Sequence, residues 1–147
     1  VLSYNGWDTH ANEGPTKGQL AGRLAALDAA LGALETGLGA AWKETAVLVV
    51  TEFGRTARVN GTAGTDHGMA TLALVVGGAV HGGRVLADWP GLKPENLYEG
   101  RDLKPTQDLR ALLKGLLRDH LGVPDGALNA TVFPGSGAVR PLQGLLV

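Results

Sequence analysis

Carboxylate and imidazole side chains occur together at two places in the sequence. Asp8 and His10 lie two residues apart in a turn-like segment, and Asp66 and His67 are adjacent between two nearby glycines. Oxygen and nitrogen donors of this kind bind zinc, manganese and iron. Either pair alone is more often an Asp that caps a turn beside a surface His. Two such pairs favour a divalent metal site, with zinc as the first candidate and manganese, calcium or magnesium as alternatives.

Other charged side chains follow an apolar segment in the middle of the chain. Glu52 could act as a general base or a metal ligand, or it could pair with a nearby arginine. Arg55 could hold an anionic ester, because guanidinium groups form bidentate hydrogen bonds with phosphate and sulfate oxygens. Arg58 is interpreted as a solvated loop charge. We therefore predict Glu52 and Arg55 as the catalytic residues.

Three apolar segments predict the strands that would position these groups, at residues 1–4, 47–51 and 72–76. Residues 46–50 are wholly apolar and β-branched at three positions, which predicts a strand buried on both faces, as in a parallel sheet. Open α/β sheets usually keep their ligands at the carboxyl ends of such strands. Both polar turns are therefore expected at one edge of the sheet.

Leucines at positions 20, 24, 27, 31, 34 and 38 alternate steps of four and three, which predicts a helix over residues 19–41. Residues 16–19 have the spacing of a capping box at its start. A second helix is predicted over residues 108–120, before Gly122. Strand, helix and strand would form a βαβ unit with parallel strands. The expected fold is therefore α/β, a three-layer αβα sandwich with a mainly parallel sheet.

Composition excludes several classes of protein. The 147 residues predict a single domain, and a net charge of -1 from scattered basic residues argues against nucleic-acid binding. There is no cysteine, so disulfides and thiolate sites are excluded. No apolar run approaches the ~20 residues of a membrane span. The chain starts without Met inside a predicted strand, which predicts a missing amino-terminal part.

Three motifs in order carry a family resemblance, with Gly100-Arg101-Asp102-Leu103 and Phe133-Pro134-Gly135 further along the chain. The motifs are Gly6-Trp7-Asp8-Thr9-His10, Thr51-Glu52-Phe53-Gly54-Arg55 and Gly64-Thr65-Asp66-His67-Gly68. The chain resembles the carboxy-terminal part of an uncharacterised, exported bacterial family related to sulfatases, within the alkaline phosphatase-like hydrolases. The resemblance implies a partial alkaline phosphatase-like domain and a twin-arginine signal on a full-length protein that is periplasmic or extracellular.

The resemblance also implies roles for individual residues. In that superfamily two Asp and His pairs and a later His bind two metal ions. Asp8 and His10 resemble the first pair, and His67 resembles the later His. At the middle pair this chain has Glu52 and Phe53, and Phe cannot bind a metal; an alternative alignment makes Asp66 and His67 that pair.

The superfamily's nucleophile lies in the amino-terminal half of its fold, outside this sequence. Two functions are therefore weighed. The first is a metal-dependent hydrolase of phosphate or sulfate esters, present as a fragment that lacks its nucleophile. The second is a non-catalytic exported binding protein on the same fold. An unrelated α/β binding domain is a third reading.

Overall fold

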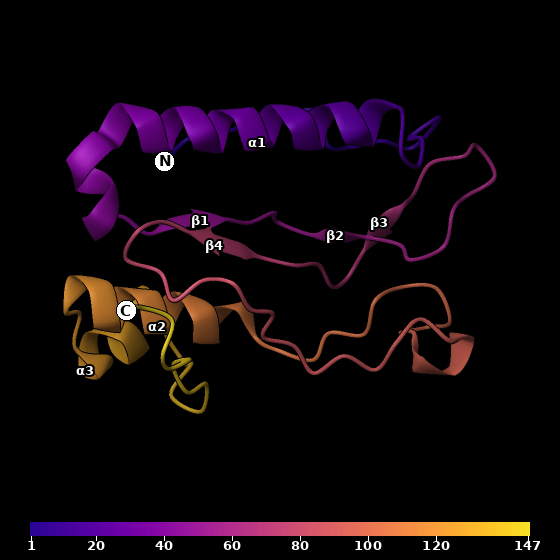
Figure 1. Cartoon of the computed structure of the whole chain (residues 1–147). Helices are drawn as coiled ribbons and strands as arrows, with labels where there is room; N and C mark the ends of the chain where they lie inside the picture. The colour runs from indigo at the N-terminus through magenta and orange to yellow at the C-terminus, as the bar shows by residue number, and fades with distance from the viewer. The chain divides into compact units, whose positions relative to one another are not determined.

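The computed structural model describes all 147 residues (Figure 1). Their contacts divide the chain into two compact units. Both units combine segments that are separated in the sequence. Unit 1 consists of Val1–Gly39, Val50–Ala73 and Pro90–Pro105. Unit 2 consists of Ala40–Val49, Leu74–Trp89 and Thr106–Val147.

The long helix of unit 1 is α1, Gln19–Leu38. Four of its six leucines are half-buried and two are exposed, and no residue of the helix is buried. The helix ends at Gly39, whose φ of 52° is left-handed, and a 3₁₀ helix, η1 (Gly39–Glu44), follows. The predicted capping box is wrong, because Gly18 occupies the N-cap and no side chain caps the helix. The Gln19 side chain instead donates to the carbonyls of residues 11 and 12.

Residues Gln19–Glu44 also form one helical stretch that is long and apolar enough to cross a membrane by length and composition, and none of it is buried. Core helices of soluble proteins and signal sequences have the same composition. The absence of a membrane span therefore stays a prediction.

The first sheet lies in unit 1 and is a short antiparallel hairpin. Its strands are β2 (Gly54–Arg55) and β3 (His67–Gly68), with Gly54 opposite Gly68 and Arg55 opposite His67. The loop 56–66 joins them. Unit 1 also contains a short 3₁₀ helix, η2 (Pro94–Asn96). The hairpin places a cationic and an imidazole side chain on neighbouring strands.

Unit 2 contains the second sheet, in which β1 (Val47–Val49) pairs antiparallel with β4 (Leu74–Val76). Its main helix is α2 (Leu109–Leu121), where the side chain of Asp108 accepts a hydrogen bond from the amide of Arg110. The helix ends at Gly122 in the left-handed conformation, as the sequence predicts. Two short helices, α3 (Asp125–Ala127) and the π-helical turn η3 (Leu128–Val132), precede the tail.

The core of unit 2 surrounds α2. The residues of α2 that are buried are Ala111, Lys114 and Gly115, and not its leucines. Gly115 allows the backbone of the tail to come close, since a Cβ there would lie 2.4 Å from the carbonyl oxygen of Leu142. Beside the helix, Leu128 is fully buried. This side of α2 is therefore covered by the carboxy-terminal segment.

The predicted three-layer αβα sandwich with a mainly parallel sheet is wrong. Both sheets have two strands, and both are antiparallel. Residues 1–4 form no strand and Val1 and Leu2 are exposed, so the βαβ unit is absent. The residues between β1 and β4 form a hairpin and contain no crossover helix, the usual connection between parallel strands.

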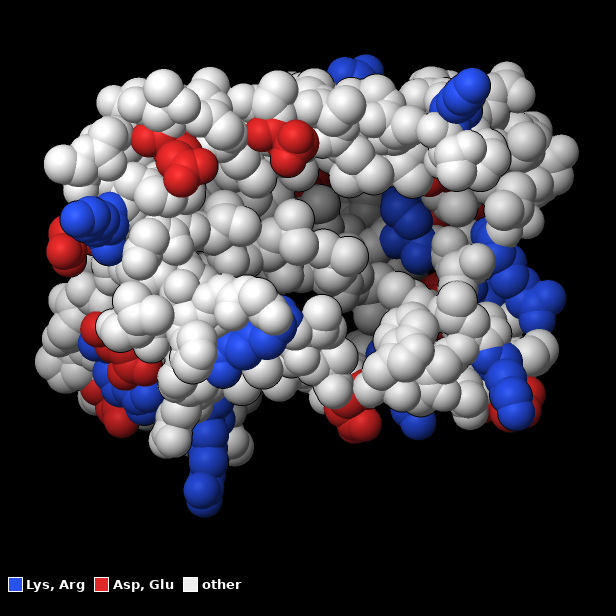
Figure 2. Space-filling view, in the orientation of Figure 1, with Lys and Arg blue, Asp and Glu red and all other residues white.

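Charged side chains are interspersed on the surface. Figure 2 shows Lys and Arg side chains among Asp and Glu side chains, with uncharged residues between them, on the visible face. The prediction that the chain does not bind nucleic acid is consistent with this distribution and stays a prediction.

Candidate metal centre

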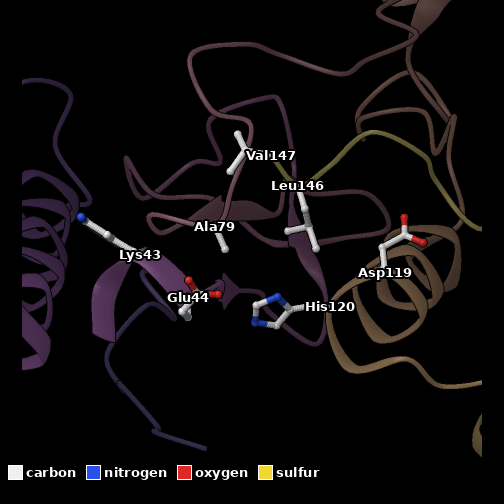
Figure 3. A pocket seen from close by; sticks show the side chains of 7 residues that line it. All are labelled: Lys43, Glu44, Ala79, Asp119, His120, Leu146 and Val147. Atoms are coloured by element: carbon white, nitrogen blue, oxygen red, sulfur yellow. The ribbon is translucent and has the colours of Figure 1, made fainter. Parts of the chain in front are cut away.

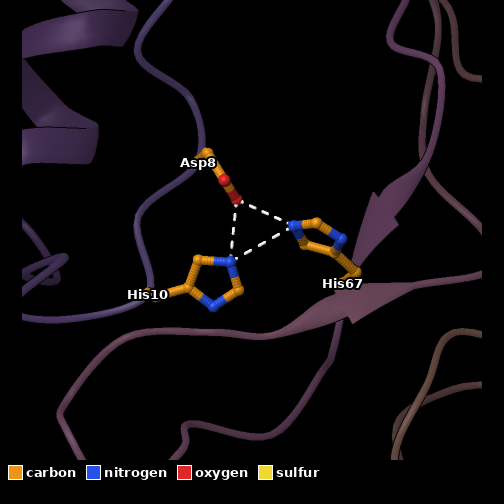
Figure 4. A group of neighbouring side chains, drawn as sticks. All are labelled: Asp8, His10 and His67. Atoms are coloured by element: carbon orange, nitrogen blue, oxygen red, sulfur yellow. Dashed lines mark hydrogen bonds and ion pairs between the residues drawn. The ribbon is translucent and has the colours of Figure 1, made fainter.

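The side chains of Asp8, His10 and His67 converge in unit 1 (Figure 4). Oδ1 of Asp8 lies 3.0 Å from Nε2 of His10 and 2.9 Å from Nε2 of His67. The two Nε2 atoms lie 3.2 Å apart. The three side chains are 48–60% exposed, so the cluster is open to solvent. We call these three side chains the triad.

The three atoms can be joined by hydrogen bonds when an imidazole carries its proton on Nε2, or by a cation when both Nε2 atoms are unprotonated. An ionised carboxylate only accepts hydrogen bonds, and a neutral imidazole has one nitrogen that only accepts. Zinc ligands lie about 2.0–2.2 Å from the ion, which separates neighbouring ligand atoms of a tetrahedral site by roughly 3.4 Å. The 2.9–3.2 Å spacing of the triad is close to this value. The donor set and its spacing therefore fit zinc or a similar cation.

Backbone hydrogen bonds, and not a common sheet edge, bring the two parts of the triad together. The loop 56–66 runs beside the segment that carries Asp8 and His10. The amide of Thr65 donates to the carbonyl of Thr9, and the amides of Asn12 and Glu13 donate to the carbonyls of residues 62 and 63. His67 follows this loop directly, in β3. The loop thus fixes His67 against the first turn.

Gly64 makes this close approach possible. A Cβ at Gly64 would lie 2.3 Å from the carbonyl carbon of His10 and 2.4 Å from its oxygen. Real Cβ contacts are essentially never shorter than 3.0 Å. Any other residue at this position would push the loop away from the turn that carries Asp8 and His10.

Asp66, which was predicted as a further ligand, lies on the other side of the His10 ring. Its Oδ1 atom is 3.4 Å from Nδ1 of His10, whereas the triad meets at Nε2. An ion bound at Nε2 would face away from this carboxylate. The structure therefore places Asp66 behind a ligand and not among the ligands.

Arg55, predicted as a catalytic residue, contacts the triad directly. Its Nη1 donates to Oδ1 of Asp8 at 2.5 Å, while Nε and Nη2 donate to the hydroxyl and the carbonyl oxygen of Thr65. A guanidinium has five N–H groups, so two remain for an anionic ligand. Arg55 orients the carboxylate of Asp8 and adds positive charge beside it.

Glu52 and Arg58 are not brought to the triad by any contact. Glu52 is exposed and makes no hydrogen bond or ion pair. Arg58 donates through Nε to the carbonyl of Gly100 at 2.9 Å, so it holds a neighbouring loop. The structure thus gives Arg55, but not Glu52, a position at the candidate site.

The sequence interpretation missed what Phe53 and Asn60 do. The ring of Phe53 stacks on the imidazole of His67, with 4.3 Å between centroids and an interplanar angle of 28°. Asn60 hydrogen-bonds both the main chain of His10 and the carboxylate of Asp66. An Asn before a glycine, as in Asn60-Gly61, is a turn signal, but it does not indicate which groups the side chain reaches.

Hydrogen bonds keep both carboxylates in their charged form. The pKa of Asp8 lies below its ordinary value, mainly because His67 and then Arg55 hydrogen-bond the carboxylate, while partial desolvation opposes the shift. The pKa of Asp66 is also lowered, first by Asn60 and to a smaller extent by His10. Ionised carboxylates bind cations, and the lowered pKa extends the pH range in which both groups are charged further into acid.

A separate hollow lies in unit 2, with a volume of about 360 Å³ (Figure 3). It is lined by Lys43, Glu44, Ala79, Asp119, His120, Leu146 and Val147. None of the predicted site residues lies there. Asp119 is already paired with Arg118 at 2.7 Å. The donor chemistry places the candidate site at the triad and not in this hollow.

Comparison with protein families gives one match. A family model described as "Protein of unknown function (DUF1501)" matches residues 1–132. The match covers most of the chain, so the chain belongs to this family. Comparisons with curated proteins and with solved structures give no match. The family match does not link the chain to sulfatases or alkaline phosphatases, so that resemblance stays a prediction.

Proposed function

We propose that this chain binds one divalent cation, with zinc preferred, and that this cation serves the hydrolysis of phosphate or sulfate esters. The observation that carries the proposal is the convergence of Asp8, His10 and His67 within 3.2 Å of one another. Three protein ligands and an open position are typical of catalytic zinc sites, whereas structural zinc sites have four protein ligands. The exposure of the triad leaves room for a substrate.

A cation held by these three side chains would supply Lewis-acid stabilisation of the negative charge that develops on the ester oxygens. Asp8 and the imidazoles of His10 and His67 would bind it, and Phe53 would keep the His67 ring in place by stacking. Arg55 would orient Asp8 through Nη1 and offer its remaining N–H groups to the anionic part of the substrate.

The resemblance implies that the nucleophile lies in the amino-terminal half of the fold, outside this sequence. The side-chain hydrogen bonds of the triad involve carboxylates, imidazoles and Arg55, and no Ser or Thr hydroxyl. We therefore propose, following the resemblance, that an amino-terminal part of a longer, exported protein provides it. The chain alone should show weak or no ester hydrolysis.

A non-catalytic exported binding protein is the second candidate function. Phe53 covers one face of His67 at a place where the resembling superfamily has a metal ligand, and Glu52 makes no contact with the triad. These two observations favour a site that binds an anionic partner through the cation without turning it over.

Metal binding tests the first part of the proposal. The chain should be stripped with a chelator and titrated with Zn²⁺, Mn²⁺, Ca²⁺ and Mg²⁺ in a calorimeter. We expect one zinc ion per chain. Loss of a residue that only hydrogen-bonds a metal ligand costs roughly 10- to 100-fold in affinity, and His67→Ala, which removes a ligand itself, should weaken zinc binding by more than this. His81→Ala is the matched control, because His81 lies in unit 2, outside the triad.

Ester hydrolysis tests the second part. Nitrophenyl phosphate and nitrophenyl sulfate should be offered to the zinc-loaded chain and to a longer protein that contains it. Zinc-dependent hydrolysis by the longer protein would support the enzyme, and zinc binding without hydrolysis in either would support the binding protein. Brisk hydrolysis by the chain that persists after chelation and in His67→Ala would show that the chemistry lies on other residues.

A further inference from the structure

We propose that Asn60 and Asp66 are positioning residues that hold His10 with its Nδ1 proton toward Asp66 and its Nε2 lone pair toward the cation. This inference rests on the proposed metal site and adds the side chains that orient one of its ligands. It also assigns Asp66 a role different from that of a ligand.

The two ring nitrogens of His10 face different groups. Nε2 lies 3.0 Å from Oδ1 of Asp8 and 3.2 Å from Nε2 of His67, so it belongs to the triad. Nδ1 lies 3.4 Å from Oδ1 of Asp66. A carboxylate can only accept, so Nδ1 is the donor in this contact. When a cation binds the lone pair of Nε2, the tautomer with its proton on Nδ1 is the one that gives both ring nitrogens a partner.

Asn60 hydrogen-bonds both residues of this contact, His10 and Asp66. Its Nδ2 donates to Oδ1 of Asp66 at 3.0 Å and to the carbonyl oxygen of His10 at 2.9 Å. The side chain of Asp66 and the main chain of His10 are thus fixed by one amide group. This leaves little freedom for the carboxylate to turn away from the imidazole.

The loop determines which way the Asn60 amide faces. Oδ1 of Asn60 accepts hydrogen bonds from the amides of Thr62 and Gly64, both at 3.0 Å. Backbone N–H groups can only donate, so the oxygen must face the loop and the NH₂ group must face His10 and Asp66. Asn60 therefore folds the loop with one end of its amide and orients the ligand with the other.

A carboxylate behind a ligating histidine is a recurring feature of metal sites. It fixes the tautomer and the ring orientation and raises the basicity of the ligand nitrogen, and its loss typically costs 10- to 100-fold in metal affinity. The contacts of Asp66 match this arrangement. Its position on the Nδ1 side excludes it from the ion that Nε2 would bind.

Asn60→Asp separates the two functions of Asn60. The variant keeps an acceptor oxygen for the loop amides but loses both N–H donors. Its added negative charge alone would attract a cation and tighten binding, whereas lost positioning would weaken it. At pH 8 we expect zinc to bind about 10-fold more weakly. Asn96→Asp adds the same charge in unit 1 without touching the triad, since Asn96 Nδ2 donates to the carbonyl of Pro90.

Asp66→Asn provides a second, independent variant, and we expect zinc affinity to fall by about 10- to 100-fold. The Co²⁺-loaded protein gives a readout that a merely structural role would not change. Its visible absorption reports the ligand set, so a positioning residue should leave the band pattern of three protein ligands in place. Thermal unfolding of the metal-free variants shows whether each is folded.

Each outcome has one meaning. If the unaltered chain does not bind zinc, the proposed metal site fails. If it binds zinc and both variants bind equally well, the positioning role is overturned while the metal site stands. If Asp66→Asn changes the cobalt spectrum to that of a site with one ligand fewer, Asp66 is a ligand and the inference is wrong.

Discussion

The triad in unit 1 and the surroundings of Lys114 in unit 2 both bring together three oxygen or nitrogen atoms that can bind a cation. Around Lys114 the acceptors are Oδ1 of Asn129 and the carbonyl oxygens of Ser136 and Val139, at 2.6, 2.7 and 3.0 Å from Nζ. This lysine is only 1% exposed. The chain thus supplies the cation for this group of oxygens, and all three ammonium donors are used.

The triad lacks such a built-in cation at its centre. Arg55 reaches Asp8 from one side but makes no hydrogen bond to either imidazole. The triad is also about half exposed, so a cation from solution can reach it. The buried oxygens around Lys114 are thus satisfied by the chain itself and serve stability, whereas the exposed triad is open to a ligand.

Lys114→Met should have the largest effect on stability. It removes the cation and leaves three oxygens without their donor in a buried place, and each buried unsatisfied group costs about 1–3 kcal/mol. We expect the free energy of unfolding to fall by about 3 kcal/mol or more, or the chain not to fold. Urea denaturation followed by circular dichroism measures this.

The control is Lys17→Met, because Lys17 is exposed. It should change the free energy of unfolding by less than about 0.5 kcal/mol. Equal effects of the two substitutions would show that the oxygens around Lys114 do not need the ammonium, and the comparison with the triad would fail.

Gly64→Ala should have an intermediate effect, mainly on metal binding. The added Cβ would meet the main chain of His10 at 2.3 Å and move the loop away from the first turn. A ligand shifted in this way should lower zinc affinity by about 10-fold, within the range for a lost supporting contact. Isothermal titration measures the affinity.

Gly61→Ala is a matched control in the same loop, since a Cβ at Gly61 meets nothing within 4 Å. We expect zinc affinity close to that of the unaltered chain. A loss of affinity in Gly61→Ala as large as in Gly64→Ala would attribute the effect to loop flexibility and not to the close approach at His10.

Residue type predicted two pairs of possible ligands and the family resemblance selected Asp8, His10 and His67 from them, but the expected reason for their convergence was wrong. Asp8, His10 and His67 were expected at the edge of a parallel sheet, and the structure joins them through hydrogen bonds between a loop and a turn. Those bonds involve main-chain atoms, which carry no sequence signal. Gly64, which lies in this contact, is a residue whose type is required by the close approach.

The helices were predictable because their signals are local, and the sheets were not. The leucine steps of α1 and the glycine at the end of α2 lie within or beside each helix, whereas the Asp108 cap was not predicted. The apolar segments that form β1 and β4 were correctly predicted as strands. A run of apolar residues does not, however, indicate whether a strand pairs parallel or antiparallel with its neighbour. The antiparallel pairing depends on the hairpin between them.

Lys114 shows a further limit of sequence patterns. The leucines of α2 are half-buried or exposed, and the buried positions of the helix are Ala111, Lys114 and Gly115. A lysine in a helix is usually a solvated residue. The acceptors that make its burial favourable come from residues 15 to 25 positions further along the chain. In the sequence, the neighbouring Gly115 is consistent with close backbone packing on this side of the helix.

Asp108 is intermediate between Lys114 and the triad. Its carboxylate is paired with a residue of the chain, as Lys114 is, but it is partly exposed, as the triad is. Its carboxylate accepts hydrogen bonds from the amide of Arg110 at 2.8 Å and from the guanidinium of the same residue. Asp108→Ala should therefore have the smallest effect, a loss of about 1 kcal/mol of stability at pH 7, which is typical of an N-cap.

This effect of Asp108 should depend on pH in a defined direction. The hydrogen bonds from Arg110 hold the pKa of Asp108 below its ordinary value in the folded chain, so between the folded and unfolded pKa the unfolded state binds more protons. The contribution is complete above the unfolded pKa of about 3.9 and is lost as pH falls through the folded pKa. Stability curves of the chain and of Asp108→Ala should converge below about pH 4, with Asp88→Ala, at an exposed position, as the control. Curves that stay parallel down to the lowest pH would show that the carboxylate charge is not what stabilises the start of α2.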